Sequence, residues 1–181
     1  MNALVELDSL TQLFPDGDRL VRHAEHIPSA LTPEPYKSLL VHSHHMTVTM
    51  ESHHGCAVDV RVLNQRLQDE DYCRKILLLK SDTEIVVQFG IVRLHMQYIS
   101  PAVRDEILAG KIPLGRVLIN HNVLRQIDLG AVLKIAPGPL LQEYFQCQPA
   151  DVVYGRLATI FCDGHPAIDL LEVSAPLPLK N

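Results

Sequence analysis

The chain has 181 residues, of which 47% are hydrophobic and 20% are charged, and its formal net charge is −5. This size and composition are typical of one globular domain with a sizeable core, and the acidic balance without a basic run argues against a nucleic-acid partner. No apolar stretch approaches the ~20 residues that span a bilayer, and the acidic N-terminus lacks the basic start of a signal peptide. We therefore expect a single domain over residues 1–181, located in the cytoplasm and without a membrane partner.

The first part of the chain is predicted to be helical. A short helix is expected within 2–14, followed by a proline-rich loop, so that residues 1–32 form an N-terminal extension with one helix. Proline is common at the first position of a helix, so Pro33 predicts the start of a second helix. The residues of this helix that are expected to face the core are Tyr36, Leu39 and Leu40.

From Met46 onward the hydrophobic period changes to two, which predicts strands. The expected hairpins pair 46–51 with 56–63, 72–79 with 84–96, and 152–162 with 166–174, and a long strand covers 123–135. A helix over 101–110 and a helical turn from Pro113 come before the long strand, while 64–71 and the proline-rich 136–151 are connections. This order predicts an α+β fold with a single antiparallel sheet of about six strands and helices packed on it.

Glu172 is a carboxylate inside an otherwise apolar strand, where a charge is unfavourable unless it is paired. If the last hairpin turns at Asp163-Gly164, Gly155 faces Glu172, and the glutamate lies on the more apolar face of the hairpin. A β-bulge would reverse this orientation. The alternative is that Glu172 lies at a strand end and reaches water.

Arg74 is likewise a charged residue in an apolar strand, 72–79, where it shares a face with Ile76 and Leu78. It is either an edge arginine whose head reaches water or a bidentate clamp for a carboxylate. Pro113 begins a helical turn, so the free N–H groups that follow it form either an anion seat or an ordinary helix cap.

Other chemistry has little support in the sequence. His42 and His44 could share a strand face, but no third ligand stands at metal spacing, so no metal is expected. The chain has neither a GxSxG nucleophile motif nor a glycine loop for phosphate. The scattered cysteines are interpreted as buried small hydrophobic residues, not as disulfides or zinc ligands, and they are Cys56, Cys73, Cys147 and Cys162.

Several segments together resemble the chorismate lyase family (chorismate pyruvate-lyase, 4-hydroxybenzoate synthase). They are Met46-Thr47 with Glu51, Arg74 before a turn, PLGR at 113–116, RQID at 125–128, YGR at 154–156, and a closing segment 164–176 that carries Glu172. The N-terminal stretch, the connection 136–151 and a histidine-rich SHHG segment depart from the family pattern. The chain therefore resembles a divergent branch of the family.

The resemblance implies a chorismate pyruvate-lyase that eliminates pyruvate from chorismate to give 4-hydroxybenzoate. Arg74 and Glu172 would be the catalytic residues: Arg74 and the backbone N–H groups of Met46 and Leu114 would hold the ring carboxylate, and Glu172 would accept a hydrogen bond from the ring hydroxyl. The further residues expected to bind substrate are Thr47, Gly115, Arg125 and Arg156, with either arginine a candidate for the enolpyruvyl carboxylate. No metal or organic cofactor is implied, the partners are chorismate and its aromatic product, and the oligomeric state stays open.

Two other functions are compatible with the same residues. One is a small-molecule-binding domain without catalysis, like the UTRA domains of transcription regulators, which resemble chorismate lyase in fold. We give it less weight because roughly 35 residues before the sheet are too few for a helix-turn-helix module. The other is an enzyme of the same fold that acts on another small aromatic acid or a thioester.

Overall fold

One antiparallel sheet forms the centre of the computed structural model, which describes residues 2–179. Within these residues the sheet has seven strands in the order β1-β5-β6-β7-β4-β3-β2, and every neighbouring pair is antiparallel. The strands are β1 (Val21–Ile27), β2 (Val58–Gln68), β3 (Asp71–Lys80), β4 (Val86–His95), β5 (Arg125–Pro137), β6 (Val153–Cys162) and β7 (His165–Ser174). The predicted α+β class with a single antiparallel sheet is confirmed.

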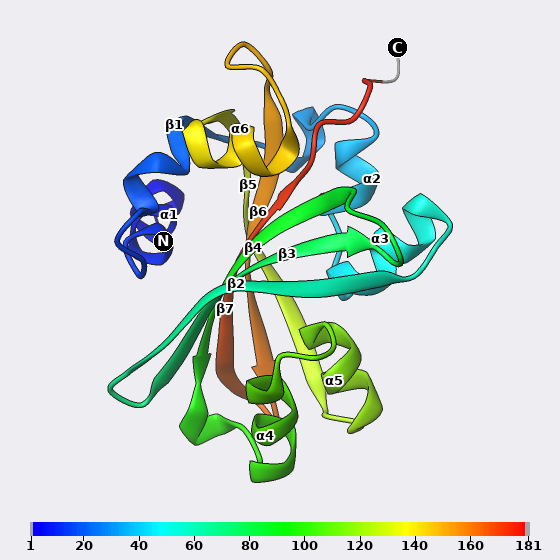
Figure 1. Cartoon of the computed structure of the whole chain (residues 1–181). Coiled ribbons are helices and arrows are strands. Elements are labelled where there is room, and N and C mark those ends of the chain that lie inside the picture. The colour runs from blue at the N-terminus through cyan, green and yellow to red at the C-terminus, as the bar shows by residue number, and fades with distance from the viewer. Residues whose placement is uncertain (1, 180–181) are drawn as a thin grey trace.

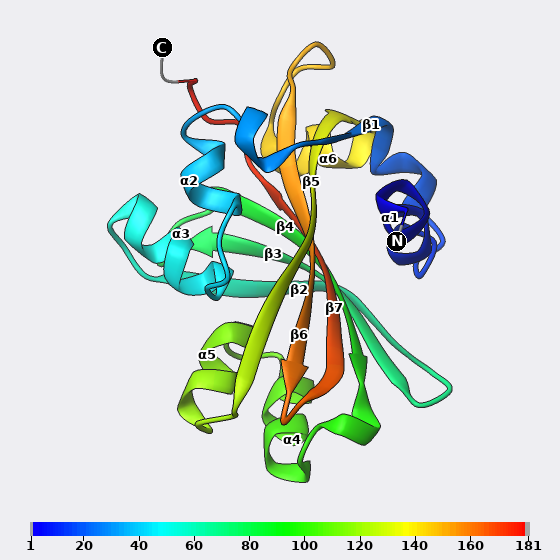
Figure 2. The ribbon, with the colours of Figure 1, turned by 180° about the vertical axis from the view of Figure 1, so that it is seen from behind.

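Helices cover both faces of this strongly twisted sheet (Figure 1). They are α1 (Ala3–Thr11), α2 (Tyr36–Leu40), α3 (Met46–His54), α4 (Pro101–Ala109), α5 (Leu114–Asn120) and α6 (Pro139–Phe145), with short 3-10 helices at Gly17–Arg19, Ser29–Leu31 and Met96–Tyr98. α1 and α6 pack on one face, where Leu10 and Leu141 join a core with Leu133 and Leu171 of the strands. α2 and α3 cover one half of the opposite face, and α4 and α5 cover the other half (Figures 1 and 2).

Two of the predicted hairpins are present. β3 and β4 are joined by a turn with Asp82 at a φ of 59°. β6 and β7 are joined at Asp163 and Gly164, which have φ values of 49° and 83°. Two successive residues with positive φ match the right-handed twist of the strands, which is why an Asp-Gly pair predicts a hairpin well.

The register of the last hairpin differs from the prediction. Cys162 faces His165 as expected, but the register shifts by one residue between Ile160 and Phe161. Beyond this bulge Arg156, not Gly155, lies opposite Glu172. Because one inserted residue reverses the parity of a strand, Arg156 lies on the same face of the sheet as the glutamate.

The predicted strand 46–51 is wrong, because this segment is helix α3. Met46 and Met50 are buried four residues apart, a spacing that suits a helix as well as a strand, while Val48 between them is 42% exposed. Packing of this apolar pair against α2 and the sheet outweighs the strand preference of the β-branched residues around it. The helix ends between the two segments that were expected to pair as a hairpin, with Gly55 at a φ of 66°.

Three further segments were assigned wrongly. β1 was expected to be part of an N-terminal extension, and its largely exposed edge position left no alternation to read in the sequence. β2 continues through most of the predicted connection 64–71, again as an edge strand. α6 lies in the supposed proline-rich connection, where Pro139 takes the first helical position, which tolerates proline.

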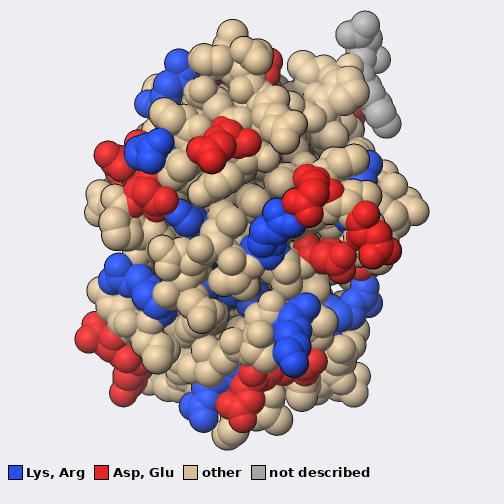
Figure 3. Space-filling model, viewed as in Figure 1, with Lys and Arg blue, Asp and Glu red and all other residues tan. Residues whose placement is uncertain are grey.

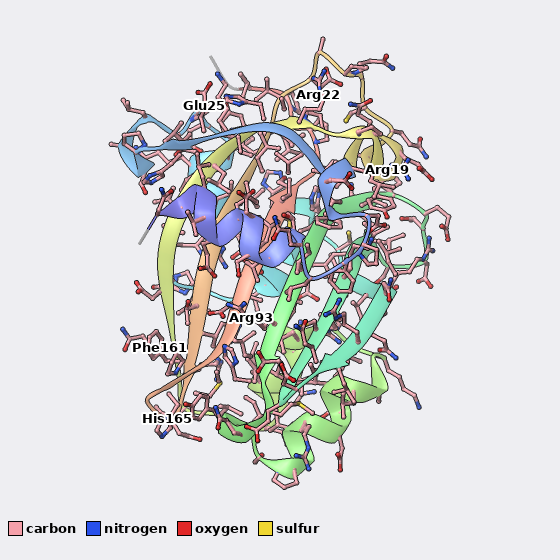
Figure 4. All side chains as sticks on the ribbon, turned by 90° about the vertical axis from the view of Figure 1, so that its left-hand side faces the viewer. Arg19, Arg22, Glu25, Arg93, Phe161 and His165 are labelled. Carbon is pink, nitrogen blue, oxygen red and sulfur yellow. The ribbon has the colours of Figure 1, made fainter. Side chains whose placement is uncertain are left out.

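Charged side chains are few within the core and otherwise dispersed. On the face shown in Figure 3, acidic and basic side chains are interspersed over a mostly uncharged surface. Beneath α1, Arg93 of β4 bonds Asp169 of β7 at 2.6 Å and reaches Ser9 of the helix (Figure 4). Across the part of the chain that the structure describes, none of the helices has the length and apolar character needed to cross a lipid bilayer.

A buried cation on the α1 side provides a test of the packing. Lys75 is 2% exposed, its ammonium lies 2.6 Å from Asp16 and 5.5 Å from the ring centroid of Phe14. Asp16→Asn leaves this ammonium unpaired and should lower the free energy of unfolding by roughly 2–4 kcal/mol. Glu84→Gln, which breaks the exposed pair with Arg61, should change it by less than about 1 kcal/mol. Urea denaturation of both variants checks this, and equal losses would contradict the packing described.

Candidate ligand-binding site

A cavity lies on the sheet face that α3 and α5 cover. It lies where the hydrophobic cluster that contains α2 and α3 meets the cluster that contains α4 and α5. Its volume is about 40 Å³. This is more than the ~10–15 Å³ that a single water needs. Apolar side chains from six strands, β2 to β7, form most of its wall, and a few polar groups converge on it.

Most of the residues predicted from the sequence to form the site line this one cavity. They are Met46, Thr47, Arg74, Leu114, Gly115, Arg156 and Glu172. Arg125 is the exception, since it lies in a neighbouring open groove. The structure therefore brings these side chains together, while the role of each remains a prediction.

Strand register arranges the floor of the cavity. On β4, Gly90 lies between Ile76 of β3 and Glu172 of β7. Arg74 and its neighbour Val92 lie two residues toward one end of the cavity, and Gln88 lies two residues toward the other. A Cβ atom at Gly90 would come within 3.2 Å of Ile76, so the missing side chain helps to keep the middle of the floor open.

Arg74 is a buried cation without a counter-ion. It is 1% exposed, its Nη1 donates to the carbonyl of Ile107 at 3.2 Å, and its Nε has no partner. No carboxylate within residues 2–179 lies at ion-pair distance from it, whereas its neighbour Lys75 on the opposite face is paired with Asp16. Burial lowers the pKa of the Arg74 guanidinium, although an arginine stays protonated at neutral pH.

Glu172, by contrast, is already paired. Its Oε2 accepts a hydrogen bond from Arg156 Nε at 2.7 Å, and the arginine is 1% exposed. The remaining N–H groups of Arg156 donate to the backbone carbonyls of His42 at 3.0 Å and His44 at 3.2 Å. Such additional hydrogen bonds are what a buried ion pair requires to be tolerated. Arg156 thus fixes the loop before α3 to the acidic end of the cavity.

Two helices begin at the rim of the cavity. Met46 is the first residue of α3 and Leu114 the first of α5, so the backbone N–H groups there have no partner within their own helices. A Cβ atom at Gly115 would lie 2.9 Å from Thr47 Oγ1 and 3.1 Å from His45 Cβ. Glycine therefore allows the two helix starts to approach closely, a contact that the sequence analysis did not predict.

Arg125 acts from outside the cavity. It donates through Nε to Nε2 of His45, the residue that precedes α3, and through Nη1 to the carbonyl of Val123 at 2.9 Å. Burial, together with the charges of Arg125 and Arg156, lowers the pKa of His45 to about 4. His45 is therefore neutral at pH 7, and Arg125 supports the wall without pointing into the cavity.

Gln88 and Gly90 were missed by the sequence analysis, although both line the cavity. Gln88 is 2% exposed and stands in the apolar run of β4. A polar residue inside an apolar strand was the signal that selected Arg74 and Glu172, and the same signal could have found Gln88.

Within the described residues, no group of three or more potential metal ligands is found.

Solved structures with a similar fold are known. The chain is similar to a domain named as the ligand-binding domain of a GntR-family transcriptional regulator from Bordetella bronchiseptica, with a TM-score of 0.52 and 12% identity over 68% of this chain and 88% of that one. It is also similar to the effector domain of PhnF from Mycobacterium smegmatis, with a TM-score of 0.51 and 10% identity over 73% and 88% of the two chains. No protein-family model and no curated protein matches the sequence.

These findings correct the expectation that the chain is an enzyme. The solved structures that align with the sheet and its helices are ligand-binding and effector domains of transcriptional regulators, so the predicted chorismate pyruvate-lyase is wrong. The chorismate lyase-like α+β fold implied by the resemblance is confirmed. The alternative to which we gave less weight, a small-molecule-binding domain without catalysis, is better supported than the lyase.

The burial of His45, together with its contact with Arg125, predicts that the fold is sensitive to acid. The pKa of His45 is about 4 in the folded chain and about 6.5 in the unfolded chain, so the unfolded chain binds the proton more readily and stability falls as pH drops from 6.5 toward 4. His45→Gln should lose less thermal stability than the wild type over this range. The low pKa of His54 is common to both proteins and cancels in the comparison. If the melting temperatures of the two proteins depended equally on pH, the low pKa given for His45 would be contradicted.

Proposed function

We propose that this chain is a non-catalytic ligand-binding domain that holds a small organic anion in the cavity beside Arg74. The observation that carries the proposal is the buried guanidinium without a counter-ion. The fold shared with ligand-binding and effector domains of regulators supports it as an analogy. The free cysteines, two of them buried, suit a location in the reducing cytoplasm.

A negatively charged ligand fits this cavity best. An unpaired charge in an apolar environment is unfavourable, and a carboxylate bound to the guanidinium would remove much of that penalty. The first N–H groups of α3 and α5, at Met46 and Leu114, add positive partial charge at the cavity rim. Glu172 does not oppose the anion strongly, because Arg156 neutralises it.

The body of the ligand should be apolar and compact. Between the polar groups the wall consists of side chains such as Ile76, Val92, Ile160 and Leu170. Small-molecule sites are commonly mostly apolar with a few polar groups that fix orientation. Small aromatic or short aliphatic carboxylic acids therefore fit better than sugars or nucleotides.

Arg74→Met tests the proposal. Charge-assisted hydrogen bonds contribute about 1.5–3 kcal/mol, so the variant should bind benzoate or hexanoate roughly 10- to 150-fold more weakly than the wild type in calorimetric titrations. Arg61→Met, which removes an exposed arginine, is the matched control and should bind both acids like the wild type.

Stability provides a second readout for the same variant. Methionine replaces a buried charge that has no ion-pair partner, so the ligand-free Arg74→Met protein should melt at the same temperature as the wild type or higher. A variant that binds the acids unchanged, or a wild type that binds none of a panel of small carboxylic acids, would contradict the proposed function.

A further inference from the structure

We infer that Gln88 selects ligands that carry a hydrogen-bond donor at the end remote from their acid group. This inference rests on the proposed function, since it describes the second pole of the same ligand. It assigns to Gln88 a role in specificity, distinct from the role of Arg74 in binding the anion.

The first observation is a pair of buried atoms. Within residues 2–179, the buried side-chain nitrogen and oxygen atoms that lack a hydrogen-bond partner are Arg74 Nε and Gln88 Oε1. Both residues line the same cavity, and they are 1% and 2% exposed. An unsatisfied buried polar atom costs about 1–3 kcal/mol, and two such atoms on residues that line one cavity fit a ligand that satisfies both.

The two atoms differ in what they need. The Nε–H of Arg74 is a cationic donor and calls for an anionic acceptor. The amide oxygen of Gln88 is a neutral acceptor and calls for a donor such as a hydroxyl or an amino group. A simple carboxylate would satisfy the first atom and leave the second without a partner.

Strand register separates these two positions. Gln88 faces Leu78 on β3, and Leu78 is four residues along the strand from Arg74. With ~3.3 Å per residue and ~4.8 Å between strands, their Cα atoms lie roughly 14 Å apart before the side chains reach inward. Gly90 and Ile76 lie between them, so the intervening floor is apolar.

Glu172 reinforces the polar pole near Gln88. It lies one strand away and two residues along, which places the two Cα atoms roughly 8 Å apart. Arg156 occupies its Oε2, while Oε1 has no hydrogen bond to any residue that the structure describes. A ligand donor at this end therefore meets acceptors from both β4 and β7. The ligand class is a small carboxylic acid with a hydroxyl or amino group at its far end.

Matched ligand pairs test the role of Gln88 by calorimetric titration. The probes are benzoate with 4-hydroxybenzoate and hexanoate with 6-hydroxyhexanoate, because the members of each pair differ only in the donor group. The wild type should bind at least one hydroxylated acid about tenfold or more tightly than its parent, since a site built to hydrogen-bond a hydroxyl rejects the analogue that lacks it. Gln88→Met should lose most of this preference while keeping its affinity for the parent acid, since Glu172 stays as the second acceptor at this end.

The controls separate this role from a general effect on the fold. Gln126→Met removes an exposed glutamine and should keep the wild-type preference. On the ligand side, 4-fluorobenzoate has a size close to that of 4-hydroxybenzoate but cannot donate, so the wild type should bind it like benzoate. This comparison needs no variant and therefore holds even if Gln88→Met fails to fold.

The possible failures are distinguishable. Acids that bind through Arg74 without any preference for the hydroxylated member would overturn the role of Gln88 and leave the proposed function intact. A preference that is undiminished in Gln88→Met would also overturn it. A wild type that binds neither member of either pair would count against the proposed function, and this inference would fail with it.

Discussion

A guanidinium buried without a counter-ion is the constraint from which the account of this protein follows. β3 carries two adjacent cations that point to opposite faces of the sheet, and among residues 2–179 a carboxylate lies beside Lys75 but not beside Arg74. Arg74 instead faces a cavity with its Nε unsatisfied. A fold that stabilised itself as far as possible would place an apolar residue there, which is why we propose that the cation is a binding group whose partner comes from outside the chain.

The remaining polar groups of the cavity are arranged around this cation. Arg156 neutralises Glu172 and at the same time holds the carbonyl groups of the loop before α3. Arg125 holds His45 at the end of that loop, and Gly115 lets α5 begin directly beside it. A ligand that reaches Glu172 would therefore touch a group bonded to the loop, which gives occupancy of the cavity a physical connection to the protein surface.

The sequence predicts the fold class and much of the cavity, but not its details. Asp163-Gly164 located the last hairpin, yet the bulge beyond it depends on tertiary packing, and it moved Arg156 rather than Gly155 opposite Glu172. Met46 and Met50 fit either period, and only contacts with α2 and the sheet decide for a helix. The edge strand β1 has too little buried surface to leave a pattern. Gln88 could have been found by its polarity, whereas the catalytic role given to Arg74 and Glu172 came from family resemblance and not from physics.

The most direct test is to observe the Arg74 Nε–H group itself. In nitrogen-15 NMR spectra of arginine side chains, with Arg74 assigned by its loss in Arg74→Met, addition of a bound carboxylic acid should move the Arg74 Nε–H proton signal downfield and slow its exchange with water. The Arg156 signal, whose Nε–H is already bonded to Glu172, should change little. An acid that binds while the Arg74 signal stays unchanged would contradict the central claim that this cation is the anion-binding group.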